Sequence, residues 1–205
     1  METPPSQAPE HIKRVTVYAS SSNALAASYY DAAARLGAVL GRAGLDIVYG
    51  GGGVGLMRAM ADQALAAGAH VHGVIPHFLN TVEHGHKSLS RLEVVADMRE
   101  RKQRMMADSH AVISLPGGSG TFEELLEALT LKRLGLFTGP VVLVNTNGYF
   151  DRFVGFLQHS VRERFMSEQH LLRWSVVQEP EGVLEAMHSA YAWSSDAREF
   201  AAVRA

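Results

Sequence analysis

The stretch AVISLPGGSGTFEELLEAL, residues 111–129, decides the fold class of this chain. It begins with a short apolar run of the kind found in buried strands. A glycine-rich turn follows, and after it a leucine- and glutamate-rich stretch of helical character. A strand that passes through such a turn directly into a helix is typical of βαβ units, so this segment predicts a parallel sheet.

The same alternation continues on both sides of this segment. Strands are expected at residues 15–19, 46–49, 70–75, 92–95, 111–115, 140–144 and 175–177. Helices are expected at residues 26–42, 56–67, 98–108, 122–134, 150–164 and 180–191, and the expected helix stops are Gly44, Gly68 and Gly135. The strands lack a clean polar alternation, as in sheets covered on both faces. We therefore expect an α/β fold, a single doubly wound (Rossmann-like) parallel sheet with helices on both faces.

Length and composition narrow the possible functions. The 205 residues, 47% of them hydrophobic, fit one domain with a substantial core. Cysteine is absent, which excludes disulfides, thiolate zinc sites and cysteine nucleophiles and suits a reducing compartment. A net charge of -2 without a basic patch argues against nucleic acid as the main ligand. The sequence shows neither a signal peptide nor an apolar run of about 18 residues, so we expect a cytoplasmic protein without a membrane partner.

The expected organisation is a domain at residues 14–193 between flexible tails at 1–13 and 194–205. One long connection, residues 76–91, interrupts the regular alternation, and loops of this length are often functional.

Two loops before the decisive turn are candidate ligand sites. Ser20, Ser21 and Ser22 follow the first strand, where hydroxyls suit an anion but helix capping explains serine equally well. Residues 49–57, YGGGGVGLM, place four consecutive glycines between a strand and a helix. Such a turn favours phosphate, although a merely tight turn remains an alternative. Its G-x-G-x-x-G pattern lacks the acidic residue of a dinucleotide site after the next strand, so NAD is disfavoured.

The decisive turn carries two carboxylates, Glu123 and Glu124, at the start of its helix. Thr121 and Glu124 match a capping box, so a helix start alone would account for them. It would not account for two glycine-rich turns that open on the same sheet edge. Upstream, Arg101 and Lys102 lie in a charged helix. Such charge usually marks a solvated face, but a guanidinium here could also hold a phosphate or a carboxylate.

Taken together, these motifs resemble the LONELY GUY family of cytokinin riboside 5′-monophosphate phosphoribohydrolases. The P-G-G-x-G-T-x-x-E motif is present as residues 116–124, the Y-G-G-G-x-x-G-L-M loop as residues 49–57, and the R-K pair as Arg101 and Lys102. The resemblance runs from about residue 15 to residue 185. The chain departs from the family pattern at Ser20, at Asn23–Ala24 and at Arg58, which affects the shape of the first two loops.

The resemblance implies a homodimer that hydrolyses an N6-substituted AMP, a small-molecule nucleotide, to free base and ribose 5-phosphate, without a metal or other cofactor. It implies Arg101 and Glu124 as catalytic residues. The residues expected to bind substrate are Ser21, Gly51, Gly52, Glu83, Met98, Lys102, Gly117, Gly118, Ser119, Gly120, Thr121, Phe122, Glu123 and Thr130.

A physical mechanism is consistent with this assignment. Cleavage of a base–ribose bond builds positive charge on the sugar, which a carboxylate beside the anomeric carbon stabilises. We assign that role to Glu124. Arg101 keeps its proton at working pH, so we expect it to orient Glu124 and hold polar substrate groups. The amides of Gly117, Gly118, Gly120 and Thr121 would hold the phosphate.

Three alternatives stay open. Related proteins have been labelled lysine decarboxylases, and that chemistry needs a pyridoxal-binding lysine, for which Lys102 and Lys132 offer no obvious context. Similar folds occur in molybdenum-cofactor carriers, which hold a phosphorylated ligand without turnover. The histidines at positions 70, 72, 77, 84 and 86 invite a metal site, but their spacing lacks a convincing third ligand.

Overall fold

The computed structural model describes residues 11–199 of the chain. Within this range a single seven-stranded sheet forms the centre of the molecule, with every neighbouring pair of strands parallel. The strands are β1 Arg14–Tyr18, β2 Asp46–Tyr49, β3 Val71–Pro76, β4 Arg91–Val95, β5 Ala111–Ser114, β6 Val141–Val144 and β7 Ser175–Val177. They lie in the order β4-β3-β2-β1-β5-β6-β7. The chain therefore winds outward from β1 in one direction and from β5 in the other, as the sequence predicted.

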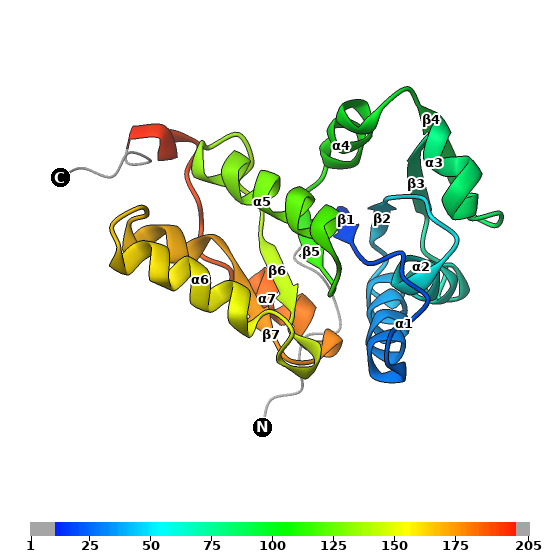
Figure 1. Cartoon of the computed structure of the whole chain (residues 1–205), viewed down its shortest axis with the longest axis horizontal. Helices are drawn as coiled ribbons and strands as arrows, with labels where there is room; N and C mark the ends of the chain where they lie inside the picture. The colour runs from blue at the N-terminus through cyan, green and yellow to red at the C-terminus, as the bar shows by residue number, and fades with distance from the viewer. Residues whose placement is uncertain (1–10, 200–205) are drawn as a thin grey trace.

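Helices cover both faces of this sheet (Figure 1). They are α1 Ala27–Arg42, α2 Gly55–Ala66, α3 His77–Leu79, α4 Met98–Met106, α5 Ser119–Arg133, α6 Asp151–Arg162 and α7 Val183–His188. Apolar side chains of α1, α2 and α7 form one core cluster with the sheet, and those of α4, α5 and α6 form the other. Successive residues of β1 alternate between them, with Val15 and Val17 in the first cluster and Tyr18 in the second. This period-two alternation places one core on each face of the sheet.

The predicted strand boundaries lie within one residue of those observed, and the helices differ more. α5 begins three residues earlier than expected, and the last helix is a 3-10 turn, η4 Pro180–Gly182, followed by the shorter α7. The predicted helix stops Gly44, Gly68 and Gly135 all adopt positive φ angles, of 70°, 90° and 70°, which explains glycine at these ends. α4 ends before Asp108, whose φ of 56° is outside the helical range.

The long connection after β3 contains the short helix α3 and a π-helix, η1 Asn80–His84. Short 3-10 helices occur at η2 Thr146–Gly148, η3 Glu168–Arg173 and η5 Ser195–Glu199. No helix within residues 11–199 combines the length and apolarity needed to cross a membrane.

The two expected tails fall partly outside the described residues, namely at 1–10 and 200–205. In the described part, Ile12 is buried in the first core cluster. Ala197, within η5, is also buried. These two residues therefore pack against the domain and do not belong to a free tail.

Candidate active site

A cavity of about 380 Å³ opens at the carboxyl ends of β1, β2 and β5. β1 and β5 are neighbours in the sheet, and the chain winds away from them in opposite directions. Doubly wound sheets bind their ligands at this switch point. The cavity is lined by Val17, Tyr18, Ala19, Ser20, Ser21, Ser22, Gly50, Met57, Met98, Arg101, Gly118, Ser119, Gly120, Thr121 and Glu124. Its volume lies in the usual range for small-molecule sites.

Glu124 reaches this cavity from the second turn of α5, and only 8% of the residue is exposed. Burial raises the pKa of its carboxyl group to about 7, although the positive charge of Arg101 opposes the rise. A charge buried in a low-dielectric setting costs free energy, so burial favours the neutral, protonated form of the carboxyl group. A carboxyl group whose pKa lies near neutral can exchange a proton at working pH, as general acid–base catalysis requires.

The start of α5 does not follow the predicted capping box. The helix begins at Ser119 with Gly118 as its N-cap, and no side chain accepts a hydrogen bond there. Thr121 and Glu124 are therefore inside the helix, and both are buried. Helix capping consequently does not explain Glu124. The first amides of a helix have no acceptor within it, and Ser119, Gly120 and Thr121 present this first turn at the cavity wall.

Arg101, on α4, is 7% exposed and lines the same cavity. Its Nε donates to the carbonyl of Val74 at 3.2 Å, and its Nη2 donates to the carbonyl of Gly50 at 3.0 Å. Among the described residues no hydrogen bond joins Arg101 to Glu124. We expected Arg101 to orient Glu124, and in this structure it does not do so through a direct hydrogen bond. The two groups interact through charge, and the guanidinium is fixed by backbone carbonyls.

Gly50 leaves the space that this guanidinium occupies. A Cβ atom at position 50 would lie 2.0 Å from Nη2 of Arg101. We expect Gly50→Ala to displace the guanidinium and to lower kcat/KM for the nucleotide hydrolysis that the sequence resemblance implies by roughly 10²-fold, since small misplacements of a positioned group have effects of this size. Steady-state kinetics of base release checks this.

Gly155→Ala is the matched control, because a Cβ atom at that position on α6 meets no atom within 4 Å. Its activity should equal that of the unmodified protein. Full activity of Gly50→Ala would show that the position of Arg101 is unimportant.

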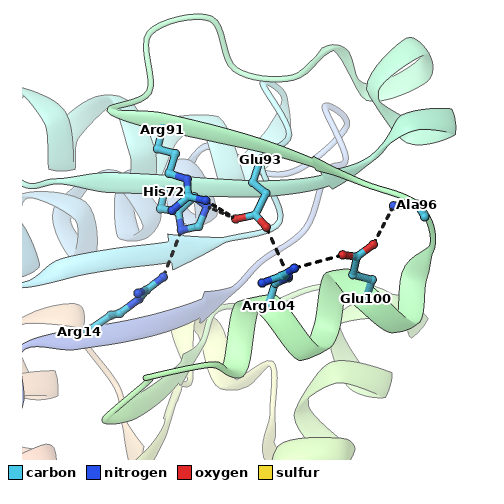
Figure 2. Close-up of polar contacts among 7 residues, drawn as sticks. All are labelled: Arg14, His72, Arg91, Glu93, Ala96, Glu100 and Arg104. Carbon is cyan, nitrogen blue, oxygen red and sulfur yellow. Dashed lines mark hydrogen bonds and ion pairs between the residues drawn. The ribbon is translucent and has the colours of Figure 1, made fainter.

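A network of polar contacts around Arg104 of α4 holds this helix against the sheet (Figure 2). Glu93 on β4 lies 3.4 Å from Arg104 on α4 and 3.1 Å from His72 on β3. Arg14 on β1 donates to Nδ1 of His72 at 3.1 Å, which leaves the imidazole proton on Nε2, facing Glu93. Burial lowers the pKa of His72, so the ring stays neutral. The network thereby ties the helix that carries Arg101 to three strands.

The start of α4 adds a further restraint. Asp97 caps the helix by accepting the amide of Glu100 at 2.8 Å, and the Glu100 carboxylate accepts the amide of Ala96 at 3.0 Å. These reciprocal bonds define where the helix begins, and they place Arg101 one turn into it.

In the other glycine-rich turn, Gly50–Gly55, several amides donate hydrogen bonds to other parts of the chain. The amide of Gly55 donates to Oδ1 of Asn23 at 3.0 Å, and the amide of Leu56 donates to the carbonyl of Ser20 at 2.9 Å. Gly53 donates to the carbonyl of His84 at 3.0 Å. The first amides of α2 therefore already have acceptors. Close chain crossings explain Gly53 and Gly55, and the amides at the start of α2 are not open to a phosphate as those at the start of α5 are.

The structure brings about half of the predicted site residues to one place. Those that line the cavity are Ser21, Met98, Arg101, Gly118, Ser119, Gly120, Thr121 and Glu124. Those that the cavity wall does not include are Gly51, Gly52, Lys102, Gly117, Phe122, Glu123 and Thr130. The side chain of Glu83 lies outside the described part of the structure.

Several of the residues away from the cavity have evident contacts. Lys102 forms ion pairs with Glu123 and, at 3.0 Å, with Glu127, and so links α4 to α5. Thr130 donates to the carbonyl of Leu126 at 2.8 Å and is exposed on α5. Phe122 packs in the second core cluster.

Sequence reasoning missed other residues of the cavity wall, among them Tyr18, Gly50 and Met57. Tyr18 ends β1, and its pKa is raised by burial and by the neighbouring Glu124. The rule that the carboxyl ends of parallel strands meet at one edge would have singled out Tyr18 and Gly50. Among residues 11–199 no group of three or more histidine, aspartate or glutamate side chains is arranged to hold a metal ion.

Comparison with known proteins gives a matching family and several similar proteins. Residues 57–187 match the profile of a family described as "Possible lysine decarboxylase". The chain is 42% identical over 156 residues to the cytokinin riboside 5′-monophosphate phosphoribohydrolase LOG of Oryza sativa subsp. japonica, a match that covers 76% of this chain and 64% of the rice protein. It is 43% identical over 155 residues to LOG1 of Arabidopsis thaliana, covering 76% of this chain and 73% of that protein.

A solved structure extends the likeness at the level of fold. The molybdenum cofactor binding protein of Rippkaea orientalis superposes with a TM-score of 0.66 at 20% identity, over 88% of this chain and 98% of that one. At this identity the likeness shows the fold alone. The profile match and the identity to the plant proteins show the family: the chain belongs to the LOG family, whose named members are cytokinin riboside 5′-monophosphate phosphoribohydrolases.

Proposed function

We propose that this protein hydrolyses the N-glycosidic bond of adenosine 5′-monophosphate, or of its N6-substituted forms, to release the free base and ribose 5-phosphate. The observation that carries the proposal is the placement of Glu124. Its buried carboxyl group lines the same cavity as the open first turn of α5. The names of the plant relatives describe an activity of this class.

The geometry supports a division of roles within the cavity. The amides at the start of α5, with the positive end of the helix dipole behind them, suit the 5′-phosphate. Glu124 lies one turn further along the same helix, so a nucleotide whose phosphate rests on these amides would present its ribose to the carboxyl group. As the bond to the base lengthens, positive charge on the ribose favours the ionised carboxylate.

Arg101 contributes a fixed positive charge. Its guanidinium cannot act as a general acid, because it keeps its proton in this pH range. It can bind polar groups of the nucleotide and oppose the rise of the Glu124 pKa that burial causes. Glu124 can also deprotonate the attacking water, since its pKa lies close to neutral.

A direct assay tests this function. Purified protein is incubated with AMP and, separately, with N6-isopentenyl-AMP, and the products are separated by chromatography. We expect equal amounts of free base and ribose 5-phosphate from at least one of the two nucleotides. Absence of base release from both, together with a bound pterin in the purified protein, would instead support the carrier function.

We also propose that the protein is a homodimer in the cytoplasm. Large apolar side chains are exposed on the described surface, for example Phe165 at 80% and Phe156 at 63%, and a second copy would cover such side chains. The absence of cysteine suits a reducing compartment. Light scattering coupled to size-exclusion chromatography tests the dimer, and a mass equal to the 22.3 kDa of one chain would contradict it.

A further inference from the structure

We infer that Tyr149 is a positioning residue for the anion-binding turn before α5. Its hydroxyl group holds the Gly117 carbonyl on the side away from the cavity, so that the next amide faces the phosphate. This role rests on the proposed function. It means that a residue outside the cavity wall affects the affinity for the nucleotide.

The contact itself connects two separate loops. Tyr149 lies between β6 and α6, whereas Gly117 lies between β5 and α5. The Tyr149 hydroxyl donates to the carbonyl oxygen of Gly117 at 2.5 Å. Burial raises the pKa of this hydroxyl, so it remains a donor across the neutral range. The two βα loops of neighbouring strands are thus joined directly beside the cavity.

Peptide geometry converts this contact into an orientation of the next amide. In a planar trans peptide the carbonyl and the following N–H point in opposite directions, and the described chain contains no cis peptide bond. With its carbonyl bound by Tyr149, the Gly117–Gly118 unit directs the Gly118 N–H away from Tyr149. Gly118 lines the cavity, whereas neither Gly117 nor Tyr149 does. A peptide flipped the other way would point a carbonyl oxygen at the phosphate and repel it.

The carbonyl groups on either side of Gly117 are also held by hydrogen bonds. The carbonyl of Pro116 accepts the amide of Ser20 at 3.3 Å, and the carbonyl of Gly118 accepts the amide of Phe122 at 3.1 Å. Three successive carbonyls are therefore bound by the protein. Of their three donors, two are main-chain amides that no substitution except proline removes. Tyr149 provides the single side-chain donor, and so the orientation of the turn can be tested through it.

The Tyr149 ring is itself held in place. It stacks on Phe122 of α5 with the ring centroids 6.2 Å apart and the planes 17° from parallel. The edge of Phe150 lies against it at 5.3 Å. Asn145 fixes the loop by accepting the amide of Phe150 at 2.7 Å and donating to Asp151 at 2.8 Å. Because the ring is anchored without its hydroxyl, Tyr149→Phe removes the hydrogen bond and leaves the packing.

The test measures binding of ribose 5-phosphate and of adenine by isothermal titration calorimetry. For Tyr149→Phe we expect the Kd of ribose 5-phosphate to rise about five- to tenfold, the usual effect of losing one such hydrogen bond. The Kd of adenine should stay within about twofold, because adenine carries no phosphate. With AMP as substrate, KM should rise by the same factor while kcat changes little, since the lost binding is common to ground and transition states.

Tyr191→Phe is the matched control, because Tyr191 is 58% exposed and packs edge-on against Trp193 away from this cavity. It should leave both Kd values unchanged. An unchanged Kd of ribose 5-phosphate in Tyr149→Phe would overturn the inference, as would an equal weakening of both ligands. The binding measurement does not need turnover, so an inactive wild-type protein would contradict the proposed function while this test still gives its answer.

Discussion

Glu124→Gln is expected to lower kcat for base release from AMP by roughly 10²–10⁴-fold, the usual contribution of a positioned acid or base. Glutamine has nearly the same shape, so it keeps the packing of α5 and of the cavity wall. It carries neither the negative charge that stabilises an oxocarbenium-like ribose nor the ability to accept a proton from water. Nucleotide affinity should change much less than kcat, because the lost interaction develops mainly in the transition state.

Single-turnover release of base, followed by chromatography, measures this effect together with the Kd for AMP. Glu185→Gln makes the same chemical change at an exposed position on α7 and should retain full activity. Near-normal release of adenine by Glu124→Gln would remove Glu124 from the mechanism.

The same substitution is expected to stabilise the folded protein at alkaline pH. The pKa of Glu124 is raised from its ordinary 4.5 to about 7 in the folded state. Between these two values the folded protein holds a proton that the unfolded chain has released, so stability falls as pH rises. Above about pH 7 the full cost of the buried carboxylate remains, roughly 3 kcal/mol for a shift of this size. Glutamine is neutral throughout and avoids this cost.

Urea unfolding of both proteins at pH 5 and pH 8 measures the effect. Glu124→Gln should unfold at a higher urea concentration than the unmodified protein at pH 8, and the difference should shrink towards pH 5. Glu185→Gln should show no such pH-dependent gain, because its carboxyl group is exposed. An equal effect of Glu124→Gln at both pH values would mean that the carboxyl group titrates normally. A gain in stability with a loss of activity would identify Glu124 as a residue retained for its chemistry.

The strands could be predicted closely because their signal is local. Asp46–Tyr49 and Ser175–Val177 are short runs rich in β-branched residues, and both were located at the observed boundaries. The start of α5 was harder to predict from the sequence. Thr121 and Glu124 match the spacing of a capping box, but the helix begins at Ser119 and places both residues inside it. A cap depends on backbone angles at one residue, which several sequence patterns satisfy equally well.

The hydrogen-bond partners of Arg101 also could not be predicted from the local sequence. The sequence places Arg101 beside Lys102 in one charged helix, and nothing in that stretch separates their roles. In the fold, Arg101 is buried against the carbonyls of Gly50 and Val74, while Lys102 is paired with carboxylates of α5. The difference of one residue on a helix turns the side chain by about 100°, so one faces the sheet edge and the other faces the neighbouring helix.

The sequence by itself determined the doubly wound sheet, and its resemblance to the LOG family singled out Glu124 and Arg101 as the expected catalytic residues. The sequence also offered two glycine-rich turns that suit a phosphate, and it placed the phosphate on the later one, at Gly117, Gly118, Gly120 and Thr121. Only the tertiary structure shows what distinguishes the two turns. The amides of Gly55 and Leu56 at the start of α2 are taken by Asn23 and Ser20, whereas the first turn of α5 opens on the cavity. Whether an amide is free depends on which distant segments pack against it, and that is a property of the folded chain.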